Sequence, residues 1–276
     1  LVSGDTFAGT YSGVFDNKNV GTGKTVTITP SYTGADVSNY TITNQASTTA
    51  NITAKGLTVS GITAANKVYD SNTTATLDVS SVSYSGLVSG DTFAGTYSGV
   101  FDNKNVGTGK TVTITSSYSG VDVSNYSITN QGSTTANVTA KALTATASAA
   151  NKTYNGNTTA STTLTFSGLI GLETLGQSVG STFNNKNVGT GKTVTVNSIT
   201  LGNGSNGGLA ANYSISAGQT TTANITAKAL TVSGITASNK IYDGNTVATL
   251  DTSSVNFGGL VSGDNFAISV SGNFSD

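Results

Sequence analysis

The chain repeats itself with a period of about 86 residues. Residues 1–57 recur almost letter for letter as residues 87–143, and a third, more diverged copy follows. Repeats of solenoid proteins run roughly 20–50 residues, whereas an independent domain needs about 50 residues or more. We therefore expect a string of small domains, each folded around its own core.

The phrase Ala-Lys-x-Leu-Thr sets the boundaries of the repeats, because it recurs at Ala54, Ala140 and Ala227. It divides the chain into the C-terminal part of one repeat, two full repeats and the N-terminal part of another, namely 1–56, 57–142, 143–229 and 230–276. Since residues 260–264 repeat residues 1–5, we expect the chain to belong to a longer array.

The composition favours strands over helices. Thr and Val, which favour strands, are abundant, as are the turn formers Gly, Asn and Ser. Glu, Arg, Gln and Met, which favour helices, are scarce or absent. We expect an all-β protein.

Several functional classes are disfavoured by what the sequence lacks. Without Cys there is no disulfide and no thiolate metal site, and without His or Cys two common catalytic groups are missing. Charged residues make up 9% of the chain with a net charge of −1 and no basic patch, which argues against nucleic-acid binding. No apolar run reaches the 18 residues of a membrane span. We expect no enzyme, no catalytic residue, no cofactor, no metal and no membrane span in this chain.

The full repeat 57–142 reads as a series of short strands separated by turns. Lys110–Thr115 alternates polar and apolar residues, as a half-buried strand does. Further strands are expected around Leu57–Ile62, Thr92–Phe101 and Ala136–Ala140, with a loop at 102–109. This spacing predicts a small immunoglobulin-like β-sandwich in each repeat. A β-grasp-like unit with one short helix is the alternative.

The segment that joins two full repeats, residues 135–144, contains neither Gly nor Pro. Flexible linkers are rich in Gly and Ser, and spacers are rich in Pro. A near-continuous β segment is therefore expected to cross the boundary and to hold the repeats in a stiff, elongated rod. In the first copy Gly56 is expected to interrupt this segment.

Recurring phrases resemble the YDG-type repeat. They are Asn66-Lys67-Val68-Tyr69-Asp70, Asn239-Lys240-Ile241-Tyr242-Asp243-Gly244-Asn245-Thr246, Lys18-Asn19-Val20-Gly21-Thr22-Gly23-Lys24 and Asn39-Tyr40. Members of that family occur in tandem in very large bacterial adhesins, often of the filamentous-haemagglutinin kind. The resemblance covers the whole chain and implies an extracellular surface protein in which the repeats form a stalk, with no catalytic residues.

The segment Gly21-Thr22-Gly23-Lys24-Thr25 has some features of a phosphate-binding loop. That motif needs a glycine five residues before the Gly-Lys pair, and Lys18 stands there instead. A hairpin loop with glycine at positive φ is the better interpretation.

Asp16–Gly21 similarly resembles a calcium loop only in part. Hard cations need oxygen ligands, and this loop places Lys18 and Val20 where ligands are required.

The lysines occupy four positions in the repeat, and each position is filled in all three copies. The sets are Lys18, Lys104 and Lys186; Lys24, Lys110 and Lys192; Lys55, Lys141 and Lys228; and Lys67, Lys152 and Lys240. Acids are less faithful to position, since Asp36 and Asp122 become Leu209 in the third copy. One position stays acidic throughout, as Asp5, Asp91, Glu173 and Asp264.

Three interpretations of these lysines compete. They form a solvated face whose stems cover apolar surface, they attract anionic sugars or other polyanions, or they form a covalent Lys–Asn staple within a small Cys-free domain. For the staple, the candidate partners are Asn125 and Asn137, with Asp91 as the proton shuttle.

The leading functional hypothesis is a structural stalk or filament segment of a bacterial adhesin that serves cell adhesion or biofilm formation. One alternative is a set of weak glycan- or mucin-binding repeats that act together; aromatic candidates for sugar stacking are Tyr11, Tyr97, Tyr32, Tyr118, Tyr40, Tyr126 and Tyr213. The other is a self-assembling extracellular fibre, in which identical chains exchange strands.

Overall fold

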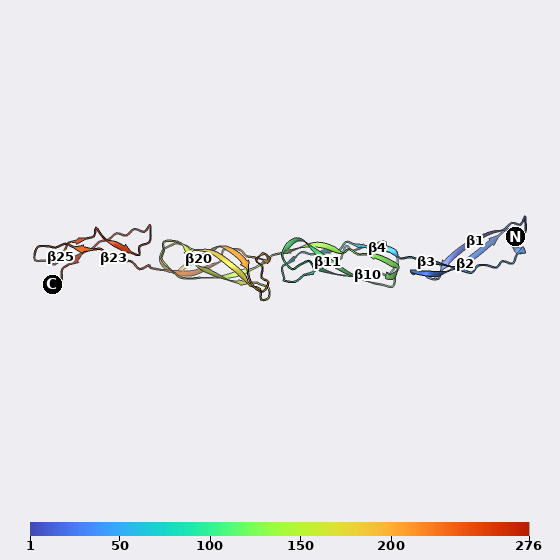
Figure 1. Cartoon of the computed structure of the whole chain (residues 1–276), viewed down its shortest axis with the longest axis horizontal. Coiled ribbons are helices and arrows are strands. Elements are labelled where there is room, and N and C mark those ends of the chain that lie inside the picture. The colour runs from blue at the N-terminus through green and yellow to red at the C-terminus, as the bar shows by residue number, and fades with distance from the viewer. Residues whose placement is uncertain (276) are drawn as a thin grey trace. The chain divides into compact units, whose positions relative to one another are not determined.

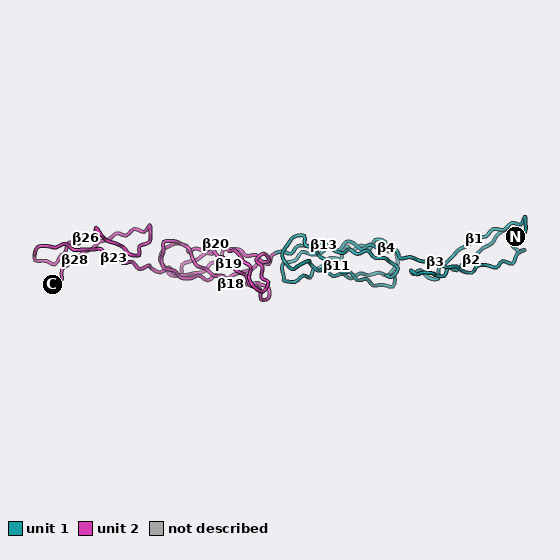
Figure 2. The backbone as a smooth tube through the Cα atoms, in the orientation of Figure 1, with its two compact units in different colours: residues 1–139 teal, residues 140–276 magenta. Residues whose placement is uncertain are grey.

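A computed structural model describes residues 1–275 of the chain, which are all-β, as predicted. Helical structure among these residues is limited to three-residue 3₁₀ turns, η1 (Val37–Asn39), η2 (Val123–Asn125) and η3 (Ala210–Asn212). The chain forms two compact units, Leu1–Thr139 and Ala140–Asp276 (Figure 2). Within the described residues, no helix has the length and hydropathy needed to cross a membrane.

The first unit contains a partial repeat followed by a complete one. The partial repeat is a single antiparallel sheet made of β1 (Ala8–Phe15), β2 (Gly21–Thr33) and β3 (Ser47–Ile52). The strands of the complete repeat are β4 (Lys55–Ser60), β5 (Thr63–Ala64), β6 (Lys67–Val68), β7 (Thr74–Ala75), β8 (Leu77–Asp78), β9 (Ser83–Ser85), β10 (Ala94–Phe101), β11 (Gly107–Ser119), β12 (Tyr126–Thr129) and β13 (Ser133–Thr139) (Figure 1).

The second unit reverses this order, with a complete repeat followed by a partial one. The complete repeat has β14 (Lys141–Ala142), β15 (Thr144–Ala149), β16 (Lys152–Thr153), β17 (Thr159–Ala160), β18 (Thr162–Ser167), β19 (Leu175–Phe183), β20 (Gly189–Asn203), β21 (Tyr213–Ser214) and β22 (Thr220–Thr226). The partial repeat has β23 (Thr231–Ser233), β24 (Thr236–Ala237), β25 (Val247–Ala248), β26 (Leu250–Asp251), β27 (Asn256–Gly258) and β28 (Gly272–Asn273).

Each complete repeat is built on a five-stranded mixed sheet. Its order is β6-β13-β11-β10-β7 in the first unit and β16-β22-β20-β19-β17 in the second. The first unit adds a three-stranded sheet, β12-β4-β9. In both sheets an early strand pairs in parallel with a late one, β4 with β12 and β6 with β13. Immunoglobulin sandwiches have antiparallel sheets, so these parallel pairs distinguish the strand order of this repeat from that of an immunoglobulin domain.

The core follows from strict alternation along the strands. In β11 the side chains of Lys110, Val112 and Ile114 face inward and their neighbours face outward. Val59 and Ile62, from the start of the repeat, join Ile114 in one hydrophobic cluster. Because β4 and β11 belong to different sheets, this cluster holds the two sheets together.

Two local expectations need correction. Gly56 lies inside β4 and pairs with Ser127, so it does not interrupt the segment there; the gap between β3 and β4 falls at residues 53–54. The loop predicted at 102–109 is shorter, because β11 begins at Gly107. The register of β11 against β13 shifts between Gly107 and Lys110, which marks a bulge.

Candidate functional site: lysines and carboxylates of the repeats

The lysine of the Asn-Lys-x-Tyr motif organises the loop that follows it. The ammonium of Lys67 donates to the main-chain oxygens of Asn72 (2.9 Å) and Thr74 (3.1 Å). It also forms an ion pair with Asp70 at 2.7 Å and lies 5.5 Å from the ring centre of Phe101. Burial alone would raise the pKa of Asp70, but Lys67 and the bonds from Asn72 lower it overall. Lys67 therefore stabilises the conformation of the loop at residues 70–74.

The same arrangement recurs in the other copies with a change of partner. Lys240 pairs with Asp243 at 2.8 Å, whereas Lys152 donates to the amide oxygen of Asn155 at 3.0 Å. Burial lowers the pKa of Lys152. Its ammonium lies 5.3 Å from the ring centre of Phe183. The contact with the aromatic ring therefore persists in a copy that has Asn155 in place of the carboxylate.

The backbone at the third residue of the Tyr-Asp-Gly phrase explains the preference for glycine there. Ser71, Gly156 and Gly244 have φ of 66°, 82° and 75°. This left-handed conformation costs an L-residue roughly 1–2 kcal/mol, a cost that glycine avoids. The sequence Tyr-Asp-Gly is thus a turn requirement.

A second lysine position clamps the loop between the two longest strands of each repeat. The buried Lys110 lies 2.8 Å from a carboxylate oxygen of Asp102 and donates to the amide oxygen of Asn103 at 2.8 Å. The ammonium holds the pKa of Asp102 below its usual value. Lys24 makes the equivalent bonds to Asp16 and Asn17. In this loop, which resembles a calcium loop in part, the side-chain oxygens bind the chain's own ammonium groups.

In the third copy this clamp uses neutral partners. Lys192 donates to Asn185 at 2.5 Å, and Asn184 stands at the position of Asp102.

The Gly-Thr-Gly-Lys segment is a turn within the bulge. Gly23, Gly109 and Gly191 have φ near 60°, which confirms the expected glycine at positive φ. The amide of Gly23 donates to the side chain of Asn51 at 2.8 Å. That amide is already used inside the repeat, so it does not line a phosphate cradle.

The third lysine position connects one repeat to the next. Within the first unit, the ammonium of Lys18, in the loop after β1, lies 2.8 Å from a carboxylate oxygen of Asp91 and 2.8 Å from one of Asp122. Nearby, the amide of Val20 donates to the side chain of Asn125 at 2.9 Å. A loop of the partial repeat therefore binds two carboxylates of the complete repeat.

The ion pairs at this junction favour the charged forms of Lys18, Asp91 and Asp122. Asp122 and Asp91 raise the pKa of Lys18, and Lys18 lowers the pKa of both carboxyl groups. Asp91 also accepts a hydrogen bond of 2.6 Å from the hydroxyl of Tyr126, and the backbone amide of Thr92 donates to Asp122 at 2.8 Å. Burial and the neighbouring Asp91 raise the pKa of Tyr126. The carboxylates of Asp91 and Asp122 are thus held in position by bonds from their own repeat, in addition to their ion pairs with Lys18.

The position that stays acidic in every copy is matched by a tyrosine. Asp91 pairs with Tyr126, Glu173 with Tyr213 at 2.6 Å, and Asp5 with Tyr40. Sequence reasoning selected the acids but missed this pairing. The Asn-Tyr phrase at the end of each 3₁₀ turn was the available signal.

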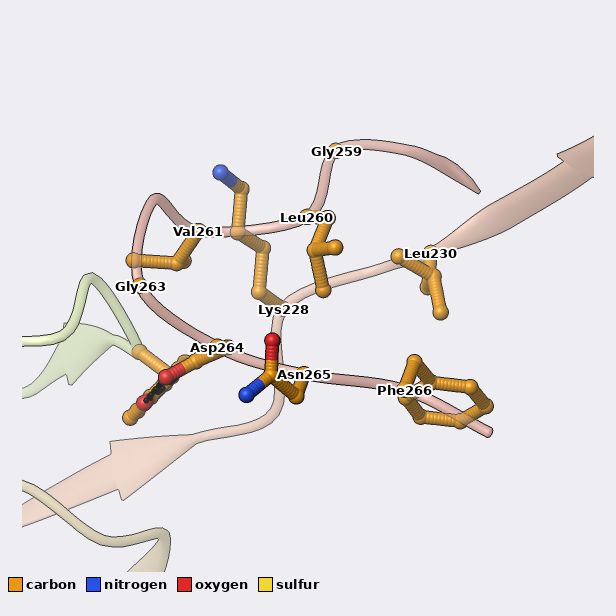
Figure 3. A pocket seen from close by; sticks show the side chains of 10 residues that line it. Lys228, Leu230, Gly259, Leu260, Val261, Gly263, Asp264, Asn265 and Phe266 are labelled. Atoms are coloured by element: carbon orange, nitrogen blue, oxygen red, sulfur yellow. Dashed lines mark hydrogen bonds between the residues drawn. The ribbon is translucent and has the colours of Figure 1, made fainter. Parts of the chain in front are cut away.

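The fourth acid of this series marks the junction within the second unit. Asp264 accepts hydrogen bonds of 2.8 and 3.0 Å from the hydroxyl of Tyr154, and Lys186 lies 3.5 Å away. Tyr154 and Asp264 raise the pKa of Lys186. Figure 3 shows Asp264 on the loop that also carries Val261 and Phe266.

The lysines not yet described are Lys104, Lys55, Lys141 and Lys228. Lys104 donates to the hydroxyl of Ser71 at 2.9 Å and lies 6.0 Å from the ring centre of Tyr69. Among residues 1–275, the ammonium groups of Lys55, Lys141 and Lys228 make no hydrogen bond or ion pair. This set leaves its charges available to solvent.

The residues considered for a covalent staple have other partners. The side-chain oxygen of Asn125 accepts from Val20, and that of Asn137 accepts from the amide of Gly109 at 2.7 Å. Asp91 bonds to Lys18 and Tyr126. The staple stays one of the three interpretations of the lysines, and intact mass tests it.

Comparison with known families accounts for the motifs. The YDG domain matches the chain four times in tandem, at residues 1–50, 53–136, 139–223 and 226–276. The chain belongs to the YDG domain family. No curated protein and no solved structure matches it. The YDG phrase is the loop held by Lys67, Lys152 and Lys240, so the family motif is structural in this chain.

Proposed function

We propose that this tandem YDG chain is a stalk or filament segment of a bacterial cell-surface adhesin. Its task is to give reach and stiffness to the protein that carries it. Each repeat contributes a fixed increment of length, and bonds between consecutive repeats restrict bending. The proposed location is extracellular.

The observation that carries the proposal is the bonding between repeats within the first unit. Lys18 reaches two carboxylates of the next repeat, and the bond from Val20 to Asn125 adds a second link. A flexible linker would leave such groups in water. Such bonds between repeats are expected in a chain whose function depends on how its repeats are joined.

The use of the lysines supports a mechanical function over recognition of polyanions. In the sets represented by Lys67 and Lys110, the ammonium groups bond to oxygens of their own repeat. Among residues 1–275, Lys55, Lys141 and Lys228 are the set whose ammonium groups make no hydrogen bond or ion pair. Three charges spread over three repeats are a weak basis for binding an anionic polymer.

Glycan binding has little support from the tyrosines. Sugar rings stack on exposed aromatic faces, whereas Tyr126 and Tyr213 are buried and their hydroxyl groups bind carboxylates. Tyr11 is 67% exposed, but its counterpart Tyr97 is half-buried, so an exposed ring does not recur at that position. We further propose that the chain has no enzymatic activity, because its acids near the junctions are bonded to lysine or tyrosine.

Small-angle scattering and single-molecule force measurements on the 276-residue chain test the proposal. A stalk gives scattering of an elongated particle, with high resistance to bending that falls when Lys18 is replaced by Ala. A compact particle, or bending that is unchanged in Lys18→Ala, overturns the mechanical function. Labelling of intact bacteria with an antibody against the chain tests its location; failure to label intact cells that label after permeabilisation contradicts the surface assignment.

A further inference from the structure

Strand β15, in the complete repeat 143–229 (the third repeat), is paired along only one of its edges. It forms a two-stranded sheet with β18, in which Ala147 lies opposite Leu164. Among residues 1–275, no other strand pairs with β15. Because this repeat spans a full YDG period, the unpaired edge is a feature of the repeat itself.

The backbone groups of Ala145 and Ala147 point out of this edge. Leu164, opposite Ala147, donates its amide to Oε1 of Gln177 at 3.0 Å and accepts from Nε2 at 2.8 Å. The pair of Ala147 and Leu164 is therefore one that exchanges no backbone hydrogen bonds, and such pairs recur at every second residue of an antiparallel ladder. The amide and carbonyl groups of Ala145 and Ala147 thus face away from β18.

The complete repeat 57–142 (the second repeat) closes the same edge with a side chain. Its segment 57–67 aligns with 143–152 with one residue missing, so Ile62 is the counterpart of Ala147. The amide of Ile62 donates to Oε1 of Gln131 at 2.9 Å, and its carbonyl accepts from Nε2 at 2.7 Å. A carboxamide has the same donor and acceptor as a peptide group. Gln131 therefore bonds to this edge as one residue of an added strand would.

The third repeat lacks that closure. Gly218 stands at the position of Gln131, because the Gln-Gly order of the second repeat is reversed to Gly-Gln. The side chain of Gln219 turns to its own loop, where Nε2 donates to the carbonyl of Ser216 at 2.8 Å. Its Oε1 is buried and has no hydrogen-bond partner among the described residues. A buried acceptor without a partner is unfavourable, and a ligand that supplies a donor removes this cost.

A groove lies between the start of β15 and the loop that follows β21. It has a volume of about 540 Å³, and Gln219 is part of its lining. β21 pairs with β14 over two residues, whereas the counterpart strands β12 and β4 pair over four. The chain therefore leaves this edge sooner in the third repeat, and the groove opens where the second repeat has further strand pairs.

Small side chains also enlarge the space beside β15. Val59 and Ile62, which are 2% and 1% exposed, are replaced by Ala145 and Ala147. Ala145 lines the groove together with the buried Leu143, and none of its ten lining residues is charged. An uncharged groove beside a free strand edge complements an extended, uncharged peptide.

We propose that the third repeat binds an extended, uncharged segment of a partner protein by strand addition to β15. The partner's backbone bonds to the amide and carbonyl groups of Ala145 and Ala147. One of its donors reaches Oε1 of Gln219, and an apolar side chain enters the groove beside Leu143. The added strand continues a pairing that the edge already makes, since Leu143 donates its amide to the carbonyl of Ser214 at 2.8 Å. This binding site is additional to the stalk function and does not depend on it.

Titration of the 276-residue chain with acetyl-Thr-Val-Thr-Ile-Thr-amide, followed by NMR, tests the site. This peptide has the sequence of residues 111–115 and is uncharged. Main-chain bonds supply much of the affinity in strand addition, so a generic strand serves as the probe. We expect backbone amide shifts at Ala145, Ala147 and Gln219, and none at Ile62. No shift at these three residues with millimolar peptide, or an equal shift at Ile62, overturns the proposal.

A variant with the residue order of the second repeat should close the edge. The double replacement Gly218→Gln with Gln219→Gly places a carboxamide at the position of Gln131. Because Gly218 has φ of 115°, which Gln disfavours, we expect the loop to adopt the path seen in the second repeat. Peptide binding should weaken by more than about tenfold.

Thr146→Val is the matched control for the double variant. Thr146 is exposed, lies next to Ala145 and is not part of the groove lining. This variant should bind the peptide as the parent chain does. Equal binding by the double variant and the parent, or equal weakening in Thr146→Val, contradicts the assignment of the site.

A measurement on the parent chain does not depend on how the variants fold. An added strand bonds through one of its two edges, and alternate residues supply each edge. The peptide is therefore N-methylated either at Val and Ile or at its Thr residues. We expect one of these peptides to bind at least about tenfold more weakly than the other. Equal affinities of the two peptides rule out strand addition.

Sedimentation without peptide separates a partner protein from a second copy of the chain. If the edge serves a partner, the parent chain and the double variant should show the same association at every concentration. Association of the parent that the double replacement abolishes would assign the edge to a second copy, and the proposed partner would then be wrong.

Discussion

The second repeat, residues 57–142, and the third, residues 143–229, place the same lysines against different partners. Lys67 bonds to a carboxylate at Asp70, and Lys152 bonds to an amide at Asn155. Asp102 is likewise replaced by Asn184 next to Lys192. The third repeat retains a single acidic residue, Glu173.

This difference teaches that the lysines need oxygen acceptors more than they need opposite charge. Both motif lysines donate to two main-chain oxygens, those of residues 72 and 74 in one repeat and 157 and 159 in the other. An exposed ion pair adds only about 0–1 kcal/mol, whereas a hydrogen bond that involves a charged group contributes about 1.5–3 kcal/mol. The third repeat has therefore lost the ion pair, which is the weaker contribution, and has kept the hydrogen bonds to the main-chain oxygens.

The largest effect is expected from the shared core, which should make the two repeats alike. Phe101 and Phe183 are each 2% exposed and each lies beside a motif lysine. Replacing either one by Ala should lower the free energy of unfolding by about 3–5 kcal/mol, because it leaves a cavity. Denaturant unfolding of the two variants checks this; a loss in one repeat alone shows that the cores are not equivalent.

The next effect concerns the motif lysines. Lys67→Met and Lys152→Met keep the aliphatic stem but remove the donor to the main-chain oxygens. We expect each to lower the free energy of unfolding by about 1–3 kcal/mol. The control is Lys55→Met, whose ammonium makes no bond among the described residues and whose replacement should stay within about 0.5 kcal/mol. If Lys67→Met matches this control, the loop does not depend on its lysine.

A smaller effect separates the turns of the two repeats. Gly156→Ser should destabilise the third repeat by roughly 1–2 kcal/mol, because Ser must adopt the left-handed conformation. The reverse change, Ser71→Gly, should stabilise the second repeat by less, since Lys104 loses an acceptor at 2.9 Å. Thermal unfolding of the pair checks the signs, and a stabilising Gly156→Ser would contradict the explanation of the motif glycine.

Acid should distinguish the repeats without mutation. The pKa values of Asp70, Asp91 and Asp122 are lowered in the folded chain. Their contribution to stability is complete above the ordinary value of 3.8 and is lost as the pH falls below it toward the lowered values. We expect the second repeat to lose protection against hydrogen exchange below about pH 4, after correction for intrinsic rates, while the third loses less. Equal losses contradict the assignment to these carboxylates.

The last prediction is that no covalent Lys–Asn bond forms, so that the mass of the chain is unchanged. Because Asp122 and Asp91 raise the pKa of Lys18, its amine stays protonated and is a poor nucleophile. The intact mass of the chain should equal the sum of its residue masses plus one water. A mass lower by one ammonia for any repeat reveals a covalent Lys–Asn staple.

Sequence periodicity was sufficient to predict the tandem all-β organisation, and alternation located Val112 and Ile114 in the core. Both signals are local or repeat at a fixed interval, so they survive in a single sequence. The parallel pairing of β4 with β12 was not predicted, because the two strands are far apart in the chain and neither encodes its partner.

The candidate residues show the same division. The sequence identified the lysines and the acidic position by comparing copies. It did not reveal that Asp91 bonds to Tyr126, or that Lys18 reaches the following repeat, because both depend on turns that bring distant residues together. Gly56 was misjudged for a related reason, since a glycine within a paired strand is tolerated when the strand is held by its neighbours.

The pairing of early with late strands has a consequence for synthesis of the chain. Ile62 bonds through its backbone to Gln131, which lies 69 residues later. As the chain emerges from the ribosome, the first half of each repeat must wait, with its apolar face open, until the second half has been made. Near-identical neighbours then compete to close it, so the divergence of the third repeat from the second gives each half a way to recognise its own partner.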